Sequence, residues 1–240
     1  MTRQTLVEVR GVHRTYGRGP TAVHAVAGVD LDVSSGEVVG LMGPSGCGKS
    51  TLLHLIGGLD RPDRGTVAVG GTDWASMRGR ALAVRRRATC GFVFQNLLLL
   101  PTATAFENVE VPLVLAGVPA LERQQRVNEV LEQVGITAQA AHLPDQLSGG
   151  QQQRVGIARA IVHRPALILA DEPTGSLDST TAEQITTLLV GAAKAQGAAV
   201  VLVTHDPAVG AHADKIVRLH SGLLDPGDSP SASLGMAVGR

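Results

Sequence analysis

Apolar residues alternate with small or polar ones near the start of the chain. Between Val23 and Val33 this alternation has a period of two, which is typical of a strand with one buried face. Leu6–Val9 and Thr66–Val69 are shorter apolar segments, and the second precedes the turn-forming pair Gly70-Gly71. Together these segments predict an antiparallel sheet near the N-terminus.

Three later segments are continuously apolar, as expected for strands that are buried on both faces of a parallel sheet. They are Glu37–Met42, Ala166–Ala170 and Ala198–Val203. Helical patterns separate them, so the chain is predicted to have an α/β core with a parallel sheet.

The middle of the chain follows the helical period instead. Glu122–Val134 carries apolar residues three or four positions apart, which form one face of a helix, and Gly135 is suited to end it. A second helix is predicted over Gln151–His163, before Pro165. We therefore expect a single domain over residues 1–225, with a helical subdomain at 96–163 inserted between core segments 1–95 and 164–225.

Charge and composition narrow the possible partners. Among 240 residues, 21 Lys and Arg balance 21 Asp and Glu, so no net charge favours capture of nucleic acid or of an anionic membrane. Two cysteines suit a reducing compartment. The longest uncharged stretch, Ala88–Phe106, contains several polar residues, so no membrane span is predicted. We expect a cytoplasmic protein that contacts the membrane only through a partner, with a disordered tail at 226–240.

Gly43–Ser50 reads GPSGCGKS and fits the P-loop pattern G-x-x-x-x-G-K-[ST]. This segment, called the P-loop below, lies between a predicted strand and a predicted helix over Lys49–Ile56. In this context, consecutive backbone N–H groups surround phosphate oxygens, the lysine reaches the terminal phosphates and the serine hydroxyl ligates magnesium. The alternative is a glycine-rich turn without a ligand. The motif predicts binding of Mg-ATP by Gly43, Pro44, Ser45, Gly46, Cys47, Gly48, Lys49, Ser50 and Thr51.

Cys47 occupies a variable position of this loop. We interpret it as a residue without a chemical role, and a thiol that is activated at the helix N-terminus is the alternative hypothesis.

Asp171 and Glu172 follow the apolar run Leu167–Ala170. Adjacent carboxylates at the end of a buried strand repel each other and lose solvation, which favours folding only if a cation or a reacting water lies beside them. We expect Asp171 to hold magnesium and Glu172 to accept the proton of the attacking water. A solvated strand end is the alternative.

Leu147–Gln151 reads LSGGQ and opens the predicted helix over Gln151–His163. Ser148 can cap this helix, while Gly149 and Gly150 leave its backbone N–H groups accessible to an anion. Since one nucleotide already has a site at the P-loop, a second such helix end suggests a nucleotide held by another copy of the chain. An ordinary capped helix is the alternative.

The P-loop, LSGGQ, the strand with Asp171-Glu172, Ser176-Leu-Asp178 and His205 occur in the order of the ABC-type ATPases, and the chain resembles this family from about Leu6 to Asp225. The resemblance implies a P-loop NTPase core with a parallel sheet, an N-terminal antiparallel β subdomain and an inserted helical signature subdomain. It also implies a head-to-tail homodimer that holds two Mg-ATP, each between one chain's P-loop and the other chain's Ser148–Gln151.

The same resemblance assigns roles to four further residues. Gln95 would contact magnesium and the attacking water, so the expected metal site comprises Ser50, Gln95 and Asp171. His205 would contact the γ-phosphate and orient Glu172. Tyr16 would stack on adenine, and Asp178 would link the two sites across the dimer.

Finer features resemble the subgroup that serves lipoprotein release, macrolide and antimicrobial-peptide export, and cell division. They are Gly57–Pro62, Gln95–Pro101, Glu107–Pro112 and Pro173–Asp178. Members pair with a transmembrane permease that has a large extracytoplasmic domain. The resemblance places the permease contact in a groove beside Gln95, lined by Leu97–Leu100 and Phe106–Val111. Four consecutive leucines are more often core than interface, and both roles can hold if some of them are buried and others exposed.

Three alternative functions are considered. A cassette of a non-transporting membrane signalling or cell-division complex would have the same motifs. An ATPase that acts on DNA or the ribosome would usually carry a second cassette, coiled coils or basic arms, which this sequence lacks. A P-loop kinase is disfavoured by LSGGQ and His205.

Overall fold

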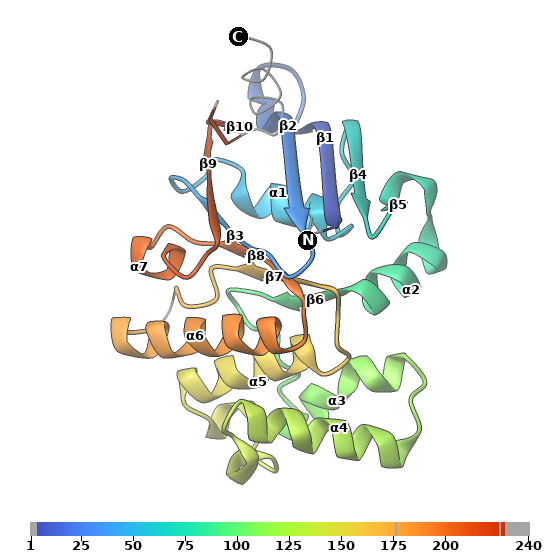
Figure 1. Ribbon diagram of the computed structural model, residues 1–240, viewed down its shortest axis with the longest axis vertical. Helices are drawn as coiled ribbons and strands as arrows, with labels where there is room; N and C mark the ends of the chain where they lie inside the picture. The colour runs from blue at the N-terminus through green and yellow to red at the C-terminus, as the bar shows by residue number, and fades with distance from the viewer. Residues whose placement is uncertain (1–3, 176, 226, 229–240) are drawn as a thin grey trace.

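The computed structural model describes residues 4–175, 177–225 and 227–228 (Figure 1). Ser176 and nearly all of the predicted disordered tail at 226–240 lie outside the described residues.

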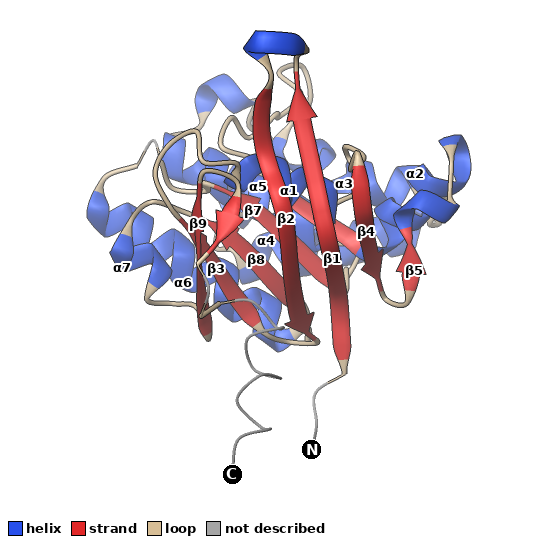
Figure 2. Ribbon diagram, turned by 90° about the horizontal axis from the view of Figure 1, so that it is seen from above, coloured by secondary structure: helices blue, strands red, loops and turns tan. Residues whose placement is uncertain are grey.

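The N-terminal part forms the predicted antiparallel sheet, in the order β2-β1-β4-β5. Its strands are β1 (Thr5–Tyr16), β2 (Val23–Ser34), β4 (Arg64–Val69) and β5 (Thr72–Asp73). Figure 2 shows them side by side as one layer. Gly70 and Gly71 both have positive φ, 56° and 71°, which the two-residue hairpin between β4 and β5 requires.

A second sheet has six strands in the order β10-β9-β3-β8-β7-β6. The strands are β3 (Val38–Met42), β6 (Cys90–Val93), β7 (Leu167–Asp171), β8 (Ala199–Val203), β9 (Lys215–His220) and β10 (Leu223–Leu224). Every pair is parallel except β10 with β9. This confirms the parallel α/β core.

Helices cover both faces of the six-stranded sheet. On one face, α1 lies between the two sheets, and on the other α5 and α6 are followed by α3 and α4 (Figure 1). The helices are α1 (Lys49–Ile56), α2 (Gly79–Thr89), α3 (Ala105–Leu115), α4 (Ala120–Gln133), α5 (Gly149–Ile161), α6 (Ser179–Ala195) and α7 (Pro207–Gly210). Short 3-10 turns occur at Gly19–Thr21, Trp74–Ser76, Thr137–Gln139 and Pro144–Gln146.

Strand β7 shows how the sheet divides the core. Leu167 and Leu169 belong to the hydrophobic cluster around α1, whereas Ile168 and Ala170 belong to the cluster around α3–α6. All four are fully buried. The continuous apolar run of the sequence follows from this burial on two faces.

The predicted helix at Gln151–His163 needs correction at both ends. Helix α5 covers Gly149–Ile161, because Ser148 caps it directly and the two glycines form its first turn. Arg164, with φ of 52°, turns the chain into the left-handed region before Pro165. Helix α2 was not predicted, because only Leu82 and Thr89 of its residues are buried and no apolar stripe marks it.

None of the helices in the described part of the chain is long and apolar enough to cross a membrane.

Candidate nucleotide site

The carboxyl ends of four neighbouring parallel strands carry most of the predicted site. Strand β3 leads into Gly43–Ser50, β8 precedes His205, β7 ends at Asp171 and β6 precedes Gln95. In the sheet these strands are adjacent, in the order β3-β8-β7-β6. Residues far apart in sequence therefore meet at one edge of the sheet, where open parallel sheets bind ligands.

At Gly43 and Gly48 the P-loop has a backbone conformation and clearance that only glycine allows. Gly48 is the N-cap of α1, with φ of 106° and no side-chain cap. A Cβ at Gly48 would lie 1.9 Å from the carbonyl oxygen of Ala25, and one at Gly43 would lie 2.2 Å from that of Leu219. The first N–H groups of α1 are thus left for a ligand without competition from a capping side chain.

Lys49 is 5% exposed, and its ammonium donates hydrogen bonds to the carbonyl oxygens of Gly43 at 2.8 Å and Pro44 at 2.9 Å. Neutral carbonyls do not compensate the charge of a buried cation, so this position suits an anion. Cys47 is 6% exposed, which favours packing over the reactive-thiol hypothesis.

Ser50 and Asp171 lie within hydrogen-bonding distance of each other. The Ser50 hydroxyl donates to Asp171 Oδ1 over 3.0 Å. Hydroxyl and carboxylate oxygens are the donors that magnesium prefers, with water completing its shell. The described residues contain no cluster of three His, Cys, Asp or Glu side chains that could hold a metal.

Glu172 lies beside His205, with Oε1 3.2 Å from His205 Nδ1. Its φ of 43° is unusual for a residue with a side chain, and its N–H is held by the carbonyl oxygen of Val203 at 3.0 Å. A Cβ at Gly175 would lie 3.5 Å from Glu172 Oε2 and 3.6 Å from Gln95 Nε2, so both side chains border this glycine. Glu172 and His205 also line a cavity of about 260 Å³.

The signature motif, Leu147–Gln151, begins α5 with a capped N-terminus, unlike the uncapped N-terminus of α1. Ser148 Oγ accepts from the Gln151 N–H at 3.3 Å, and Gln151 Oε1 accepts from the Ser148 N–H at 2.8 Å. Ser148 and Gly149 are exposed. No hydrogen bond within the described part of the chain joins this motif to Gly43–Ser50, so the structure does not unite them within one chain.

Tyr16 lies at the end of β1 and is 41% exposed. Its hydroxyl donates to Asp60 Oδ2 over 2.7 Å, and the guanidinium of Arg14 lies 4.7 Å from the ring centroid. The ring is thus fixed while much of it stays accessible. The sequence did not identify Arg14 and Asp60 as partners of Tyr16.

Asp178 caps α6, since Oδ1 accepts from the Thr181 N–H at 3.0 Å. This hydrogen bond holds the pKa of the Asp178 carboxyl below its usual range, so Asp178 carries a negative charge on an exposed surface.

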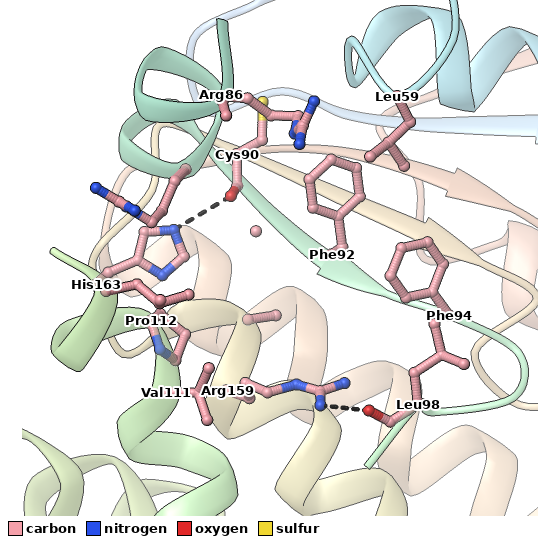
Figure 3. A pocket seen from close by; sticks show the side chains of 15 residues that line it. Leu59, Arg86, Cys90, Phe92, Phe94, Leu98, Val111, Pro112, Arg159 and His163 are labelled. Carbon is pink, nitrogen blue, oxygen red and sulfur yellow. Dashed lines mark hydrogen bonds between the residues drawn. The ribbon is translucent and has the colours of Figure 1, made fainter. Parts of the chain in front are cut away.

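A mostly apolar groove of about 450 Å³ lies between α2, β6, α3 and α5 (Figure 3). Leu98 and Val111 line it, but Leu99 packs on the helical core instead, so the leucine run divides between groove and core. The α2 wall was missed because α2 was not predicted. The lining residues are Leu59, Ala83, Arg86, Arg87, Cys90, Gly91, Phe92, Phe94, Leu98, Val111, Pro112, Leu115, Arg159, Ala160 and His163.

Burial tunes the ionisable groups of the groove. It raises the pKa of the Cys90 thiol to about 12, lowers the pKa of His163 and lowers the pKa of Arg159. Arg159 donates to the carbonyl oxygens of Leu97 and Leu98. A bond from α5 therefore holds the segment that follows Gln95.

Comparison with known proteins supports one family. The chain is 44% identical to the uncharacterized ABC transporter ATP-binding protein YknY of Bacillus subtilis (strain 168), over 96% of this chain and 100% of that protein. It is 44% identical to the lipoprotein-releasing system ATP-binding protein LolD of Legionella pneumophila (strain Paris), over 89% and 94%.

Among solved structures, the chain resembles the dimeric structure of a post-hydrolysis state of the ATP-binding cassette MJ0796 bound to ADP and Pi. The TM-score is 0.85 and the sequence identity 42%, over 92% of this chain and 97% of that one. The family model described as ABC transporter matches residues 26–175. This chain, with its P-loop edge and its signature helix, belongs to the ABC transporter family.

Proposed function

We propose that two copies of this ATPase subunit close head to tail over two Mg-ATP and drive a membrane permease at the inner face of the cell membrane. One observation carries the proposal. The P-loop edge gathers Lys49, Asp171, Glu172 and His205, whereas no hydrogen bond among the described residues joins the P-loop to Ser148, which begins a second helix end suited to an anion. The dimeric cassette MJ0796, bound to ADP and Pi, supports this assembly.

Nucleotide binding follows from the local geometry. The uncapped N–H groups of α1 would bind phosphate oxygens, and Lys49 would exchange its carbonyl partners for the terminal phosphates. Tyr16, held by Asp60, would stack on adenine. Magnesium, when bound by Ser50, Asp171 and Gln95, would neutralise charge on the phosphates.

Hydrolysis would rely on Glu172 as the acceptor of the proton from the attacking water. His205, 3.2 Å away, would hold the Glu172 carboxylate in place and contact the γ-phosphate. Gln95, whose Nε2 borders Gly175 together with Glu172 Oε2, would orient the water. The chain thus supplies positioning and charge stabilisation, which account for most catalysis in phosphoryl transfer.

Each site would be completed by the partner chain. Ser148 Oγ uses a lone pair in its cap, which leaves its O–H free to donate to a γ-phosphate, beside the N–H groups of Gly149 and Gly150. Asp178, exposed and charged, would face the other site across the dimer.

The permease would dock in the groove of Figure 3. The walls are mostly apolar, Leu98 is 60% exposed and Leu115 59% exposed, which is unfavourable unless a partner covers these leucines. Arg159 connects this groove through the Leu97 and Leu98 carbonyls to the segment after Gln95. A partner there could therefore respond to the nucleotide.

An export system whose permease has a large extracytoplasmic domain is the form we favour, because a relative is the ATP-binding protein of a lipoprotein-releasing system. A cassette that signals or supports cell division without moving a substrate would have the same site. Co-purification of the permease, followed by its sequence, distinguishes the two.

Replacing Glu172 with Gln tests the catalytic site. The variant keeps its hydrogen-bonding shape but cannot accept a proton, so we expect ATP binding to persist while turnover falls by about 10²–10⁴. Size-exclusion chromatography with ATP should then show an accumulated dimer. Turnover near that of the natural chain would remove Glu172 from its role.

Replacing Leu98 with Glu tests the groove. A charge on an exposed apolar wall should prevent co-purification of the permease with the cassette, while ATP binding by the isolated chain stays unchanged. Leu121, 70% exposed on α4 and outside the groove, provides the matched control when it is replaced with Glu. Equal loss of the permease with both variants would exclude the groove as the docking site.

A further inference from the structure

Helix α2 concentrates positive charge in a protein whose total charge is zero. Five of the ten residues from Arg78 to Arg87 are arginines, and the chain has no Asp or Glu from Trp74 to Phe106. The five are Arg78, Arg80, Arg85, Arg86 and Arg87.

These arginines lack the carboxylate partners found elsewhere. Arg10 pairs with Asp32, Arg126 with Glu122 and Arg164 with Glu129. Within residues 4–175, 177–225 and 227–228, none of these five arginines forms an ion pair. Among the residues that the structure describes, Arg86 donates only to the carbonyl oxygen of Gly58, and Arg85 Nε is buried without a hydrogen-bond partner. Their charge is therefore available to an external anion.

The outward side of α2 combines this charge with a shallow apolar hollow. Val84, which is 45% exposed, is one of the apolar residues that line it. Its polar side chains are the guanidinium groups of Arg80 and Arg85. The lining residues are Met77, Arg80, Ala81, Val84, Arg85 and Ala88. We call this surface, together with the exposed N-cap residue Arg78, the α2 basic face.

We propose that the α2 basic face binds the phosphate groups of anionic phospholipids at the membrane surface. Guanidinium forks match phosphate oxygens, and apolar side chains between basic ones suit the boundary between headgroups and acyl chains. A peptide would also need acceptors for its own N–H groups, and no side chain of the hollow provides one.

The position of α2 agrees with this ligand. The opposite side of the helix contributes Ala83, Arg86 and Arg87 to the groove. If a permease occupies that groove, the α2 basic face lies next to the membrane protein; this step rests on the proposed function, whereas the charge argument does not. A zero net charge predicted contact through the permease alone, and the local distribution of charge leads to a different expectation.

The test uses the full chain and vesicles without any permease. Vesicles of phosphatidylcholine are compared in sedimentation with vesicles that contain about 30% phosphatidylglycerol, at low and high salt. The test variant replaces Arg78, Arg80 and Arg85 with Gln, none of which lines the groove. The control replaces Arg10, Arg126 and Arg164 with Gln, which removes the same charge from paired positions.

We expect the natural chain and the control to bind the anionic vesicles, and high salt to release them. The test variant should bind about 10²-fold more weakly, which corresponds to about 1 kcal/mol for each arginine near the surface. Equal binding to both vesicles, or equal binding by test and control variants, would overturn the proposal. So would a test variant that loses the permease in detergent but not the vesicles, since the face would then bind an acidic protein segment.

Discussion

The N-termini of α1 and α5 are both suited to an anion, but they are built in different ways. Gly48 begins α1 in a left-handed conformation and offers no side chain, so the N–H groups of the first turn have no competitor. Ser148 begins α5 with a complete capping box, in which its hydroxyl and the Gln151 side chain satisfy two N–H groups.

We interpret the α1 end as the main binding site of the nucleotide and the α5 end as the part that completes this site in another chain. The α1 end depends on a ligand, with a buried Lys49 whose partners are neutral carbonyls. The α5 end satisfies its own cap without a ligand and would add a hydroxyl hydrogen and exposed glycines to a nucleotide held on another surface. A cassette built in this way would bind ATP alone and hydrolyse it after pairing.

The largest expected effect comes from disabling one end in each of two chains. Replacing Ser148 with Arg should abolish hydrolysis but leave ATP binding, and replacing Lys49 with Ala should abolish both. An equimolar mixture should regain activity, because a mixed dimer combines the intact P-loop of one variant with the intact α5 end of the other. Random pairing would restore about a quarter of the sites.

Steady-state ATPase assays of the mixture, against each variant alone, measure this recovery. If the mixture stays as inactive as its components, or if the Ser148 variant alone is fully active, the two ends do not share a nucleotide.

A smaller effect should distinguish a glycine that the backbone conformation requires, Gly48, from one that leaves room for a nucleotide, Gly149. In Gly48→Ala the new Cβ would meet the Ala25 carbonyl at 1.9 Å with φ of 106°, so we expect a loss of about 3 kcal/mol in unfolding free energy. In Gly149→Ala the nearest atom is Leu177 Cδ2 at 3.6 Å, an ordinary contact. Stability should rise by up to about 1 kcal/mol, because alanine favours helix more than glycine.

Hydrolysis distinguishes the two roles, since the Gly149 variant should bind ATP normally yet turn it over about tenfold more slowly, as its methyl group keeps a partner's phosphate away. Chemical denaturation and ATPase rates give both quantities. A Gly149 variant that is more stable and fully active would show that the α5 glycines are not needed for access.

The α1 end could be predicted from the sequence almost completely, and the α5 end only in part. A strand, a glycine pattern and a helix of fixed spacing define Gly43–Ser50, so even the bounds Lys49–Ile56 are confirmed. Gly149 and Gly150 are poor helix formers, so their place in α5 depends on the cap at Ser148 and could not be deduced from propensity.

The surfaces around α2 were beyond sequence reasoning for a related physical cause. Only two of its residues are buried, so no hydrophobic period marks the helix, and the groove wall that it forms went unseen. The partners of Tyr16 were also missed, because Asp60 is 44 positions away in the chain.

The smallest expected effect uses a second capping box as a control. Thr104 also begins α3 with a capping box, since Thr104 Oγ1 accepts from the Glu107 N–H at 3.2 Å and Glu107 accepts from the Thr104 N–H at 2.7 Å. Within the described residues, and unlike the Ser148 hydroxyl, the Thr104 hydroxyl also donates to Glu107 Oε2, at 2.9 Å. Replacing Ser148 or Thr104 with Ala should lower the unfolding free energy by about 1 kcal/mol in each case, because each change removes one helix cap. Only Ser148→Ala should also slow hydrolysis, by about five- to tenfold, since its hydroxyl hydrogen would donate to the nucleotide. Equal ATPase rates in the two variants would reduce Ser148 to a structural cap, and the comparison with α1 would then rest on the backbone of α5 alone.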